Sequence, residues 1–246
     1  MLVPGTQKRQ CLIYLVIDTS GSMDGTKISQ VNYSIPQVLS SIQDLNDSNP
    51  EAEIEVALLA FDSHARWVTK NPEKPEDLKK HWKDLTANGL TELGEACNFL
   101  NEKMHRTKNG GFHDDSAGAL TAGVIFITDG LPTGSYKPAL AKLQKNHWYK
   151  DAFKYCLACG DDLSEGMSVF EELVGNNECI HLISDENACR LGDYIRVVTA
   201  IVSDSVSSTI PLGETNKEDN NQGTFNQDAV DQINEEVKSI DDLIDD

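Results

Sequence analysis

The hydrophobic pattern of the chain predicts buried strands that alternate with amphipathic helices. Continuous apolar runs of strand length occur at 11–18, 52–62, 121–130, 152–160 and 178–184. Between these runs, apolar residues recur every three or four positions, as one buried helix face requires, from 28 to 45, from 93 to 104 and from 191 to 198. Pro36 falls inside the first helical stretch and is expected to interrupt or kink it.

The type of strand predicts the fold class. Strands that are apolar throughout, rather than at every second position, belong to a sheet that is covered on both faces. Strand and helix in alternation predict an α/β protein with a Rossmann-like, doubly wound, mostly parallel sheet and helices on both faces. The segment "ARWVTK" at 65–70 follows a turn and is expected to form one short antiparallel edge strand. We expect an N-terminal extension at 1–10, one domain at 11–204 and an acidic tail at 205–246.

Composition and charge narrow the classes of partner. The chain has 246 residues, 39% of them hydrophobic, which is enough for one large domain with a core. Its formal net charge is -19, and roughly half of this excess lies after Leu212. Nucleic acid and anionic membrane surfaces require a concentration of Lys and Arg that the chain does not assemble, so neither is an expected partner.

The N-terminal region and the cysteines suggest a location. Lys8 and Arg9 precede an apolar run at 11–17 that is too short to span a membrane and has no small-residue cleavage site. We therefore expect a cytoplasmic protein whose cysteines are thiols. Cys156 and Cys159 form a CxxC pair that could bind zinc, but on a strand residues three apart point to opposite faces, which favours core cysteines.

Oxygen-bearing side chains follow the carboxyl ends of the predicted strands. Asp18, Ser20 and Ser22 come at every second position directly after the first strand, Thr91 lies in a glycine-containing loop, and Asp129 ends the strand at 121–130. In a doubly wound sheet these ends share one rim, which is where ligands bind. Oxygen donors from separate segments suit a hard divalent cation, with Mg²⁺ most expected and Mn²⁺ or Ca²⁺ also open. A partner's carboxylate is the natural ligand for the coordination position that remains. The alternative is that Ser20 to Ser22 form a helix-capping turn and that Asp129 begins an ordinary turn.

These residues resemble the metal-ion-dependent adhesion site of the von Willebrand factor type A domain. The family pattern D-x-S-x-S corresponds to 18–22, the loop G-x-T-x-x-G to 89–94, and T-D-G to 128–130. The resemblance covers about residues 10–205 and implies that the hydroxyls of Ser20, Ser22 and Thr91 contact the ion directly. It implies that Asp18 and Asp129 often act through water.

Within that family the chain resembles the TerY group of bacterial tellurite-resistance and stress-response proteins. The stretches that carry this likeness are "LVIDTSGSMDGTKISQVN", "VALLAFDSHARWV", "FITDGLPTG" and "YIRVVTAIVSDSVSS". The likeness implies a cytoplasmic, non-enzymatic interaction module associated with kinase and phosphatase partners or with membrane-stress systems. Residues 205–246 contain no cysteine, so they differ from the cysteine-rich extension of some TerY relatives.

Two other functions remain as alternatives. A magnesium-dependent phosphatase of the haloacid dehalogenase type would use Asp18 as its nucleophile, but it needs a second acid where this chain has Ser20. The second alternative function is that of a structural scaffold whose metal site is unoccupied. An EF-hand loop starting at Asp18 fails because Met23 stands where glycine is required. A phosphate-binding loop fails because neither Ser nor Thr follows Lys27.

Two further segments carry expectations. The glycine-rich stretch 107–120 is interpreted as a mobile surface loop of the rim that helps to choose the partner, and His113 within it as part of a solvated turn. In the tail, apolar residues at helical spacing among acids predict a short amphipathic helix at about 228–244. That helix would dock on a basic groove of a partner or on the chain's own body, unless the tail is simply solvated.

Overall fold

The computed structural model describes residues 8–114, 120–161, 163, 166–208 and 227–242. Its centre is a six-stranded sheet with the strand order β3-β2-β1-β4-β5-β6. The strands are β1 (Arg9–Asp18), β2 (Ala52–Phe61), β3 (Ala65–Trp67), β4 (Gly123–Thr128), β5 (Phe153–Cys159) and β6 (Ile180–Ile183). All neighbouring strands pair in parallel except β2 and β3, which pair antiparallel. The predicted fold class, including the short antiparallel edge strand, is therefore confirmed.

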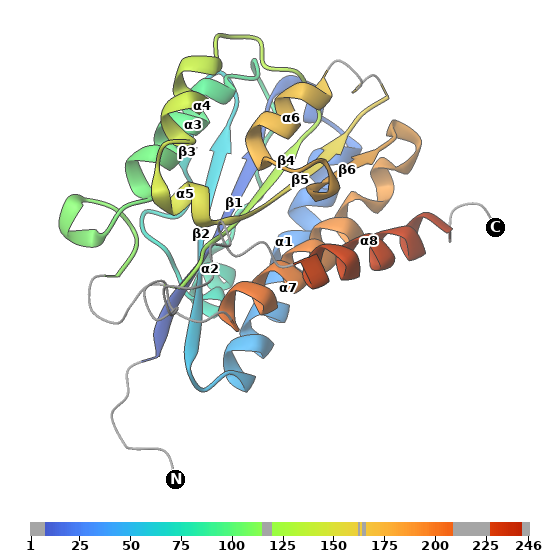
Figure 1. Cartoon of the computed structure of the whole chain (residues 1–246). Helices are drawn as coiled ribbons and strands as arrows, with labels where there is room; N and C mark the ends of the chain where they lie inside the picture. The colour runs from blue at the N-terminus through green and yellow to red at the C-terminus, as the bar shows by residue number, and fades with distance from the viewer. Residues whose placement is uncertain (1–7, 115–119, 162, 164–165, 209–226, 243–246) are drawn as a thin grey trace.

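Helices cover both faces of this sheet (Figure 1). One face carries α1 (Thr26–Ser48), α7 (Leu191–Ser207) and α8 (Gln227–Asp242), with α2 (Pro75–His81) beside α1. The other face carries α3 (Leu93–Lys103), α4 (Lys137–Leu143), α5 (His147–Asp151) and α6 (Met167–Val174). Short 3₁₀ turns lie at η1 (Gly21–Met23), η2 (Thr107–Asn109), η4 (Asn177–Cys179) and η5 (Asp185–Arg190).

The central strands explain why the sheet needs both layers. From Cys11 to Asp18 every residue of β1 is buried, and β4 is buried along its whole length. At roughly 25 cal/mol for each Å² of apolar surface removed from water, covering both faces of such strands is the main stabilising contribution to the fold. Cys156 and Cys159 are fully buried in β5, as predicted for core cysteines.

The long helix α1 forms where the apolar spacing predicted it. Ile28, Val31, Ile35 and Ile42 lie on its buried side. The helix continues through Pro36, so the proline does not interrupt it. Helices α4, α5 and α6 had no counterpart in the sequence pattern, because five to eight residues are too few to display a helical period.

The described part of the segment 107–120 lies at the other end of the sheet, so its predicted place on the rim is wrong. The backbone N–H of Asp114 donates to Gln10 Oε1 at 2.8 Å, and that of Leu120 donates to the Gln10 carbonyl at 3.4 Å. Gln10 is near the start of β1, whereas Asp18 ends it, and eight residues of strand span about 26 Å. Helix α3 leads from the rim back to the amino ends of the strands, which the composition of the loop did not reveal.

His113 is buried rather than part of a solvated turn. Only 1% of its surface is exposed, its ring stacks on Trp148 at 4.1 Å between centroids, and its Nε2 lies 3.2 Å from the Tyr14 hydroxyl. Burial lowers its pKa to about 3, and the positive charges of His147, Arg106 and His105 act in the same direction. His113 is therefore a neutral core residue.

Helix α8 packs on the chain's own body. Its buried residues are Ala229, Val230, Ile233 and Val237. The Tyr194 hydroxyl of α7 donates to Asp241 at 2.5 Å, and the Tyr155 hydroxyl of β5 donates to Asn234 at 3.5 Å. The described part of the helix expected at about 228–244 thus lies beside α7 and contacts β5 of the sheet, whereas 243 and 244 lie outside the described residues.

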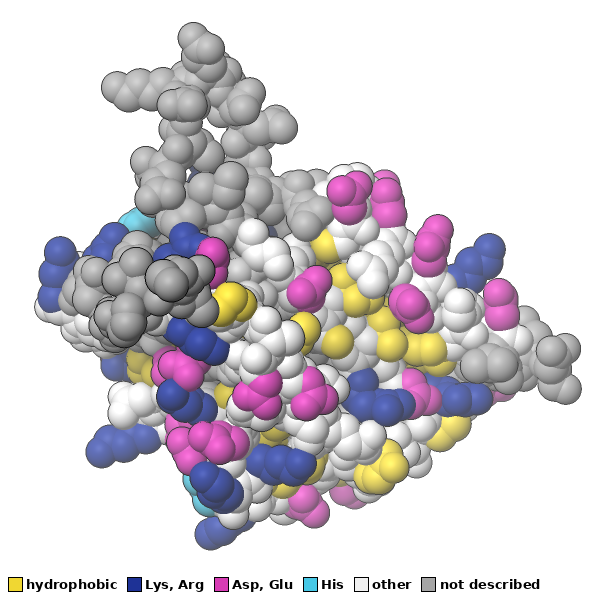
Figure 2. Space-filling view, turned by 90° about the horizontal axis from the view of Figure 1, so that it is seen from below, with side chains coloured by type: hydrophobic (Ala, Val, Ile, Leu, Met, Phe, Trp, Pro, Cys, Tyr) yellow, Lys and Arg dark blue, Asp and Glu magenta, His cyan; other side chains and the backbone are white. Residues whose placement is uncertain are grey.

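The described residues visible in Figure 2, which shows the end of the molecule where the amino ends of the strands lie, do not concentrate one sign of charge. Lys and Arg side chains alternate there with Asp and Glu, and hydrophobic side chains show between them. None of the helices in the described part of the chain combines the length and the apolar character needed to cross a membrane.

Candidate functional site

Three loops at the carboxyl ends of the strands are tied together by their backbones. The N–H of Thr19 donates to the Phe61 carbonyl at 2.7 Å, and that of Asn88 donates to the Thr19 carbonyl at 2.8 Å. The N–H of Gly21 donates to the Gly89 carbonyl at 3.0 Å. The loop after β1 is therefore held between the end of β2 and the loop that leads into α3.

Glycine is required where these loops approach each other. Gly89 has φ 81°, a conformation that side-chain-bearing residues rarely adopt, and a Cβ at this position would lie 2.5 Å from Ser63 Oγ. The same loop is joined to the loop after β4, because Thr91 N–H donates to Thr133 Oγ1 at 3.2 Å and Thr133 N–H donates to the Thr91 carbonyl at 3.0 Å. All three segments of the predicted site thus converge on one region of the rim.

Asp18 is fully buried at the end of β1. Its Oδ1 accepts the Ser20 N–H at 2.8 Å, and its Oδ2 accepts the Thr128 hydroxyl at 2.7 Å. Burial raises its pKa to about 6, and the negative charge of Asp129 adds to this, although the hydrogen bonds from Ser20 and Thr128 oppose it. Among the described residues no cation pairs with Asp18, so its charged form is costly in this environment.

A chain of hydrogen bonds joins the two serines to Asp129. Ser20 Oγ and Ser22 Oγ are 3.1 Å apart, and Ser22 Oγ donates to Asp129 Oδ1 at 2.7 Å. The other oxygen, Asp129 Oδ2, accepts from Lys27 Nζ at 2.9 Å, and Lys27 Nζ also lies 2.9 Å from Asp185 Oδ1. Burial acts to lower the pKa of Lys27, but the two carboxylates outweigh it and the pKa is raised.

The hydroxyl of Thr91 faces the same region of the rim as the hydroxyl of Ser22. A Cβ built on Gly130 would lie 3.7 Å from both Thr91 Oγ1 and Ser22 Oγ, so the two hydroxyls flank a single point. In the part of the chain that the structure describes, the Thr91 hydroxyl has no hydrogen-bond partner, although only 6% of the residue's surface is exposed. Its lone pairs are free to accept a ligand.

The structure therefore brings all five predicted site residues together at the rim: Asp18, Ser20, Ser22, Thr91 and Asp129. They offer oxygen only, from two carboxylates and three hydroxyls, which is the chemistry that a hard divalent cation prefers. The described residues contain no group of three or more His, Cys, Asp or Glu side chains that is placed to hold a metal ion by those residue types alone. The donor set fits Mg²⁺ or Mn²⁺ because the three hydroxyls and the two carboxylates together supply five oxygen donors, close to the six that these ions prefer.

Sequence reasoning missed Lys27 and Asp185 as members of this region. The one available signal was a lysine in the first turn of a helix, where the helix dipole opposes a positive charge. Such a lysine needs nearby carboxylates, but the sequence does not identify them, because Asp129 lies in the loop after β4 and Asp185 begins η5 after β6.

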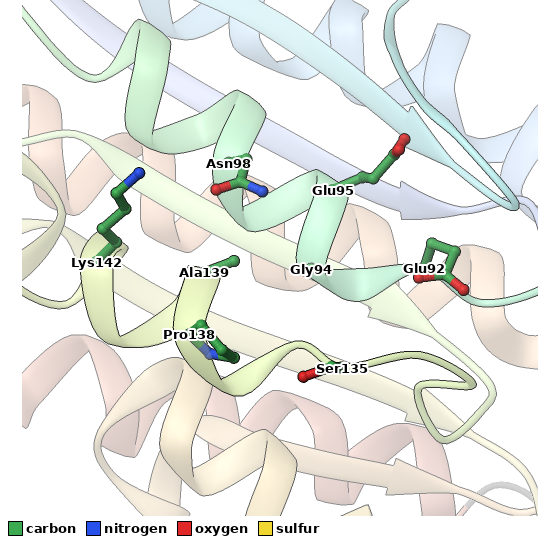
Figure 3. Close-up of a pocket in the computed structure, with 8 residues that line it drawn as sticks. All are labelled: Glu92, Gly94, Glu95, Asn98, Ser135, Pro138, Ala139 and Lys142. Atoms are coloured by element: carbon green, nitrogen blue, oxygen red, sulfur yellow. The ribbon is translucent and has the colours of Figure 1, made fainter.

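A groove opens beside Thr91 between α3 and α4 (Figure 3). Its volume is about 330 Å³. Glu92 and Glu95 lie toward the rim, Asn98 lies between the helices, and Lys142 lies at the far end. The groove thus carries both signs of charge and begins next to the cluster of oxygen donors.

The sequence is similar to a known family and to one curated protein. A family model described as "von Willebrand factor type A domain" matches residues 13–173. Inter-alpha-trypsin inhibitor heavy chain H4 from the pig, Sus scrofa, is 28% identical over 160 residues. That match covers 61% of this chain and 16% of the pig protein, so the chain spans only a small part of this relative's length.

Several solved structures share the fold. A von Willebrand factor type A protein from Catenulispora acidiphila matches 79% of this chain and 43% of its own, with 18% identity and a TM-score of 0.57. Proximal thread matrix protein 1 from the mussel byssus, "with zinc occupied MIDAS motif", matches 80% and 48%, with 14% identity and a TM-score of 0.59. The pilus adhesin SpaC from Lactobacillus rhamnosus GG matches 80% and 31%, with 15% identity and a TM-score of 0.60.

Proposed function

The chain belongs to the von Willebrand factor type A domain family, and from this premise we propose that it is a metal-dependent protein-interaction module. Asp18, Ser20, Ser22, Thr91 and Asp129 hold a divalent cation at the rim. A carboxylate from a partner protein completes the coordination. In this proposal the module is not an enzyme, because the serine hydroxyls and the carboxylates of the rim serve as ligands of the cation, and the described rim residues include no histidine or cysteine paired with them as a catalytic base or nucleophile.

The observation that carries this proposal is the convergence of oxygen donors from three separate segments. Ser22 Oγ is 2.7 Å from Asp129 Oδ1 and 3.1 Å from Ser20 Oγ, and Thr91 Oγ1 flanks the same point with no partner of its own among the described residues. A capping turn would explain Ser20 and Ser22 alone. It would not explain why the Thr91 hydroxyl, which has no hydrogen-bond partner among the described residues, faces them from the loop before α3.

The charge of the donor set supports binding of an anion. Two carboxylates only balance a divalent ion, and the hydroxyls add no charge, so a bound ion would remain an electrophilic centre for an anionic oxygen. The hydroxyls of Ser20, Ser22 and Thr91 are the proposed direct ligands. Asp18 accepts hydrogen bonds from its own loop on both oxygens, which suits a role through water.

Mg²⁺ is the ion we propose, because the donors are all hard oxygens and cellular availability favours it over Mn²⁺. The mussel protein named above has a zinc-occupied MIDAS motif, which supports a divalent cation in this family without fixing which one. Ca²⁺ would require more oxygen ligands, which flexible loops and water would have to supply.

The surroundings of the site provide surfaces that distinguish partners. Leu90, which precedes Thr91, and Leu131, which follows Asp129 by two residues, are 56% and 37% exposed. The groove between α3 and α4 begins at Glu92, next to Thr91. We therefore propose a partner segment that has an acidic side chain at the ion and apolar or charged neighbours over these surfaces.

The cellular setting is proposed from the likeness to the TerY group. The module would act in the cytoplasm in a bacterial stress or tellurite-resistance system, with kinase or phosphatase components as partners. We propose 11–204 as the interaction domain and 205–246 as an acidic tail whose helix α8 is docked.

The test compares the wild-type protein with Thr91→Val, which keeps the shape of the side chain and removes the unpartnered hydroxyl. Thermal unfolding is measured in chelator and during titration with MgCl₂ or MnCl₂. The wild type should be stabilised by either ion, and the variant should need roughly tenfold more of it, the cost of about one good ligand. Equal responses of the two proteins, or no response of either, would refute the proposal.

A further inference from the structure

Lys27 forms an ion pair with the candidate ligand Asp129, on the carboxylate oxygen that does not contact Ser22. Its ammonium lies 2.9 Å from Asp129 Oδ2, while Asp129 Oδ1 points to the hydroxyl of Ser22. The Asp129 side chain is fully buried, and only 14% of the Lys27 side chain is exposed. The two oxygens of one carboxylate are thus divided between a fixed cation of the protein and the cluster of oxygen donors.

The local structure of α1 does not account for a lysine at this position. Lys27 is in the first turn of the helix, where the unsatisfied N–H groups already carry partial positive charge, and no acidic residue of that turn offsets it. Its carboxylate partners come from elsewhere: Asp129 follows β4, and Asp185 follows β6. The lysine is therefore held by the rim, not by its own helix.

The charges of the rim change in two ways because of Lys27. Asp18 and Asp129 carry two negative charges, and Lys27 cancels one of them, so the site attracts a divalent cation less strongly than its carboxylates alone would. With the cation bound, the same three residues and the ion sum to one positive charge instead of zero. A nearby anion is then attracted more strongly.

We infer that Lys27 is a specificity-determining residue that lowers the site's affinity for the divalent cation and raises the loaded site's affinity for a carboxylate. This inference rests on the proposed metal site. Asp185 moderates the effect, because its carboxylate, 2.9 Å from the Lys27 ammonium and about half exposed, neutralises part of that charge from the solvent side. Lys27 also fixes the orientation of Asp129, since it holds the oxygen that faces away from the serines.

The experiment uses Mn²⁺ as the cation and acetate as the carboxylate, with acetamide as its neutral counterpart. Electron paramagnetic resonance of free Mn²⁺ gives the cation affinity of the full chain. The relaxation of ¹³C-acetate by protein-bound Mn²⁺ gives the affinity of the loaded site for the anion. The variants are Lys27→Met, Lys27→Arg and Asp185→Asn, and Lys150→Met is the control for the same charge change on the exposed side of α5.

Lys27→Met should bind Mn²⁺ roughly tenfold tighter than the wild type does. Once loaded with Mn²⁺, it should bind acetate roughly threefold more weakly. Both factors are what the loss of one unit charge a few ångströms away should cause in a water-like dielectric. Lys27→Arg should behave as the wild type in both measurements. Asp185→Asn should move both affinities in the opposite direction, and Lys150→Met should move neither. Acetamide binding should not respond to any of the variants.

The outcomes separate this inference from the function on which it rests. If the wild type binds Mn²⁺ and Lys27→Met changes neither affinity, or changes both in the same direction, the inference is wrong and the metal site stands. If neither the wild type nor Lys27→Met binds Mn²⁺, both are wrong. If Lys27→Met binds Mn²⁺ and the wild type does not, Lys27 controls cation binding as inferred, and the proposed function of the native chain fails.

Discussion

Replacing Asp18 with Asn should make the metal-free protein more stable while removing its response to metal. The carboxylate of Asp18 is fully buried, and its pKa is raised from 3.8 to about 6. The fold therefore penalises the charged form that prevails at neutral pH. Asn keeps the shape, can accept the Ser20 N–H through its oxygen, and can donate to the Thr128 hydroxyl through its amide.

The size of the effect follows from the pKa shift. A group whose folded pKa is raised stabilises the fold fully below its unfolded pKa, and this contribution is lost as the pH rises through the folded pKa. A shift of about two units corresponds to about 3 kcal/mol that Asp18 costs at pH 7.5, and roughly half of that at pH 5. For a chain of this size, the corresponding rise in the melting temperature is about 6–12 °C.

The assay is thermal and urea unfolding of the wild type and Asp18→Asn at pH 7.5 and pH 5, in chelator and in MgCl₂. In chelator the variant should be the more stable protein, with the larger difference at pH 7.5. In MgCl₂ the wild type should recover stability, by about 2.7 kcal/mol at a hundredfold excess over its Kd, and the variant should not respond.

A different order of stabilities would refute the reasoning. If Asp18→Asn is less stable than the wild type in chelator at pH 7.5, Asp18 is not a strained buried carboxylate. If the two proteins gain equally from MgCl₂, Asp18 is not part of the cation site. Either result can be obtained without knowledge of the partner.

Three further predictions address the site, the core and the tail. Thr91→Val should leave the free energy of unfolding in chelator within about 0.5 kcal/mol of the wild type, because its hydroxyl has no partner among the described residues, and a larger loss in urea unfolding would show a structural role instead. His113→Ala should cost about 1–3 kcal/mol at pH 7.5, where the neutral ring is fully stabilising. It should also flatten the loss of stability as the pH falls from 6.5 toward 3, and an unchanged pH profile would contradict the lowered pKa. Ile233→Ala should cost about 2–4 kcal/mol because this side chain of α8 is fully buried against the rest of the chain, whereas the exposed Glu236→Ala should change urea unfolding by less than about 0.5 kcal/mol, and equal effects would mean that α8 is not docked in solution.

The sequence was informative where residue type and strand period act together. Continuous apolar strands required a sheet covered on both faces, and such a sheet gathers its carboxyl ends at one rim. Asp18, Thr91 and Asp129 are far apart in the chain, yet this rule placed them together. The hydrogen bonds that join their loops, such as those of Thr19 with Phe61 and Asn88, follow from that geometry.

The sequence was uninformative where the answer depends on the direction of a connection or on a contact between distant loops. Polar and glycine-rich composition indicated that 107–120 lies at the surface, but not at which end of the sheet. His113 looked solvated because its neighbours are polar, and its stacking on Trp148 has no sequence signature. The contacts of Lys27 with two aspartates were hidden for the same reason.

The most direct test of the central claim is the anomalous diffraction of Mn²⁺ in crystals of the full chain soaked with MnCl₂. We expect one strong peak about 2.0–2.3 Å from the hydroxyl oxygens of Ser20, Ser22 and Thr91. We also expect this peak to be absent from crystals of Asp18→Asn. A peak at any other position, or none in the wild type at millimolar Mn²⁺, would contradict the proposed cation site.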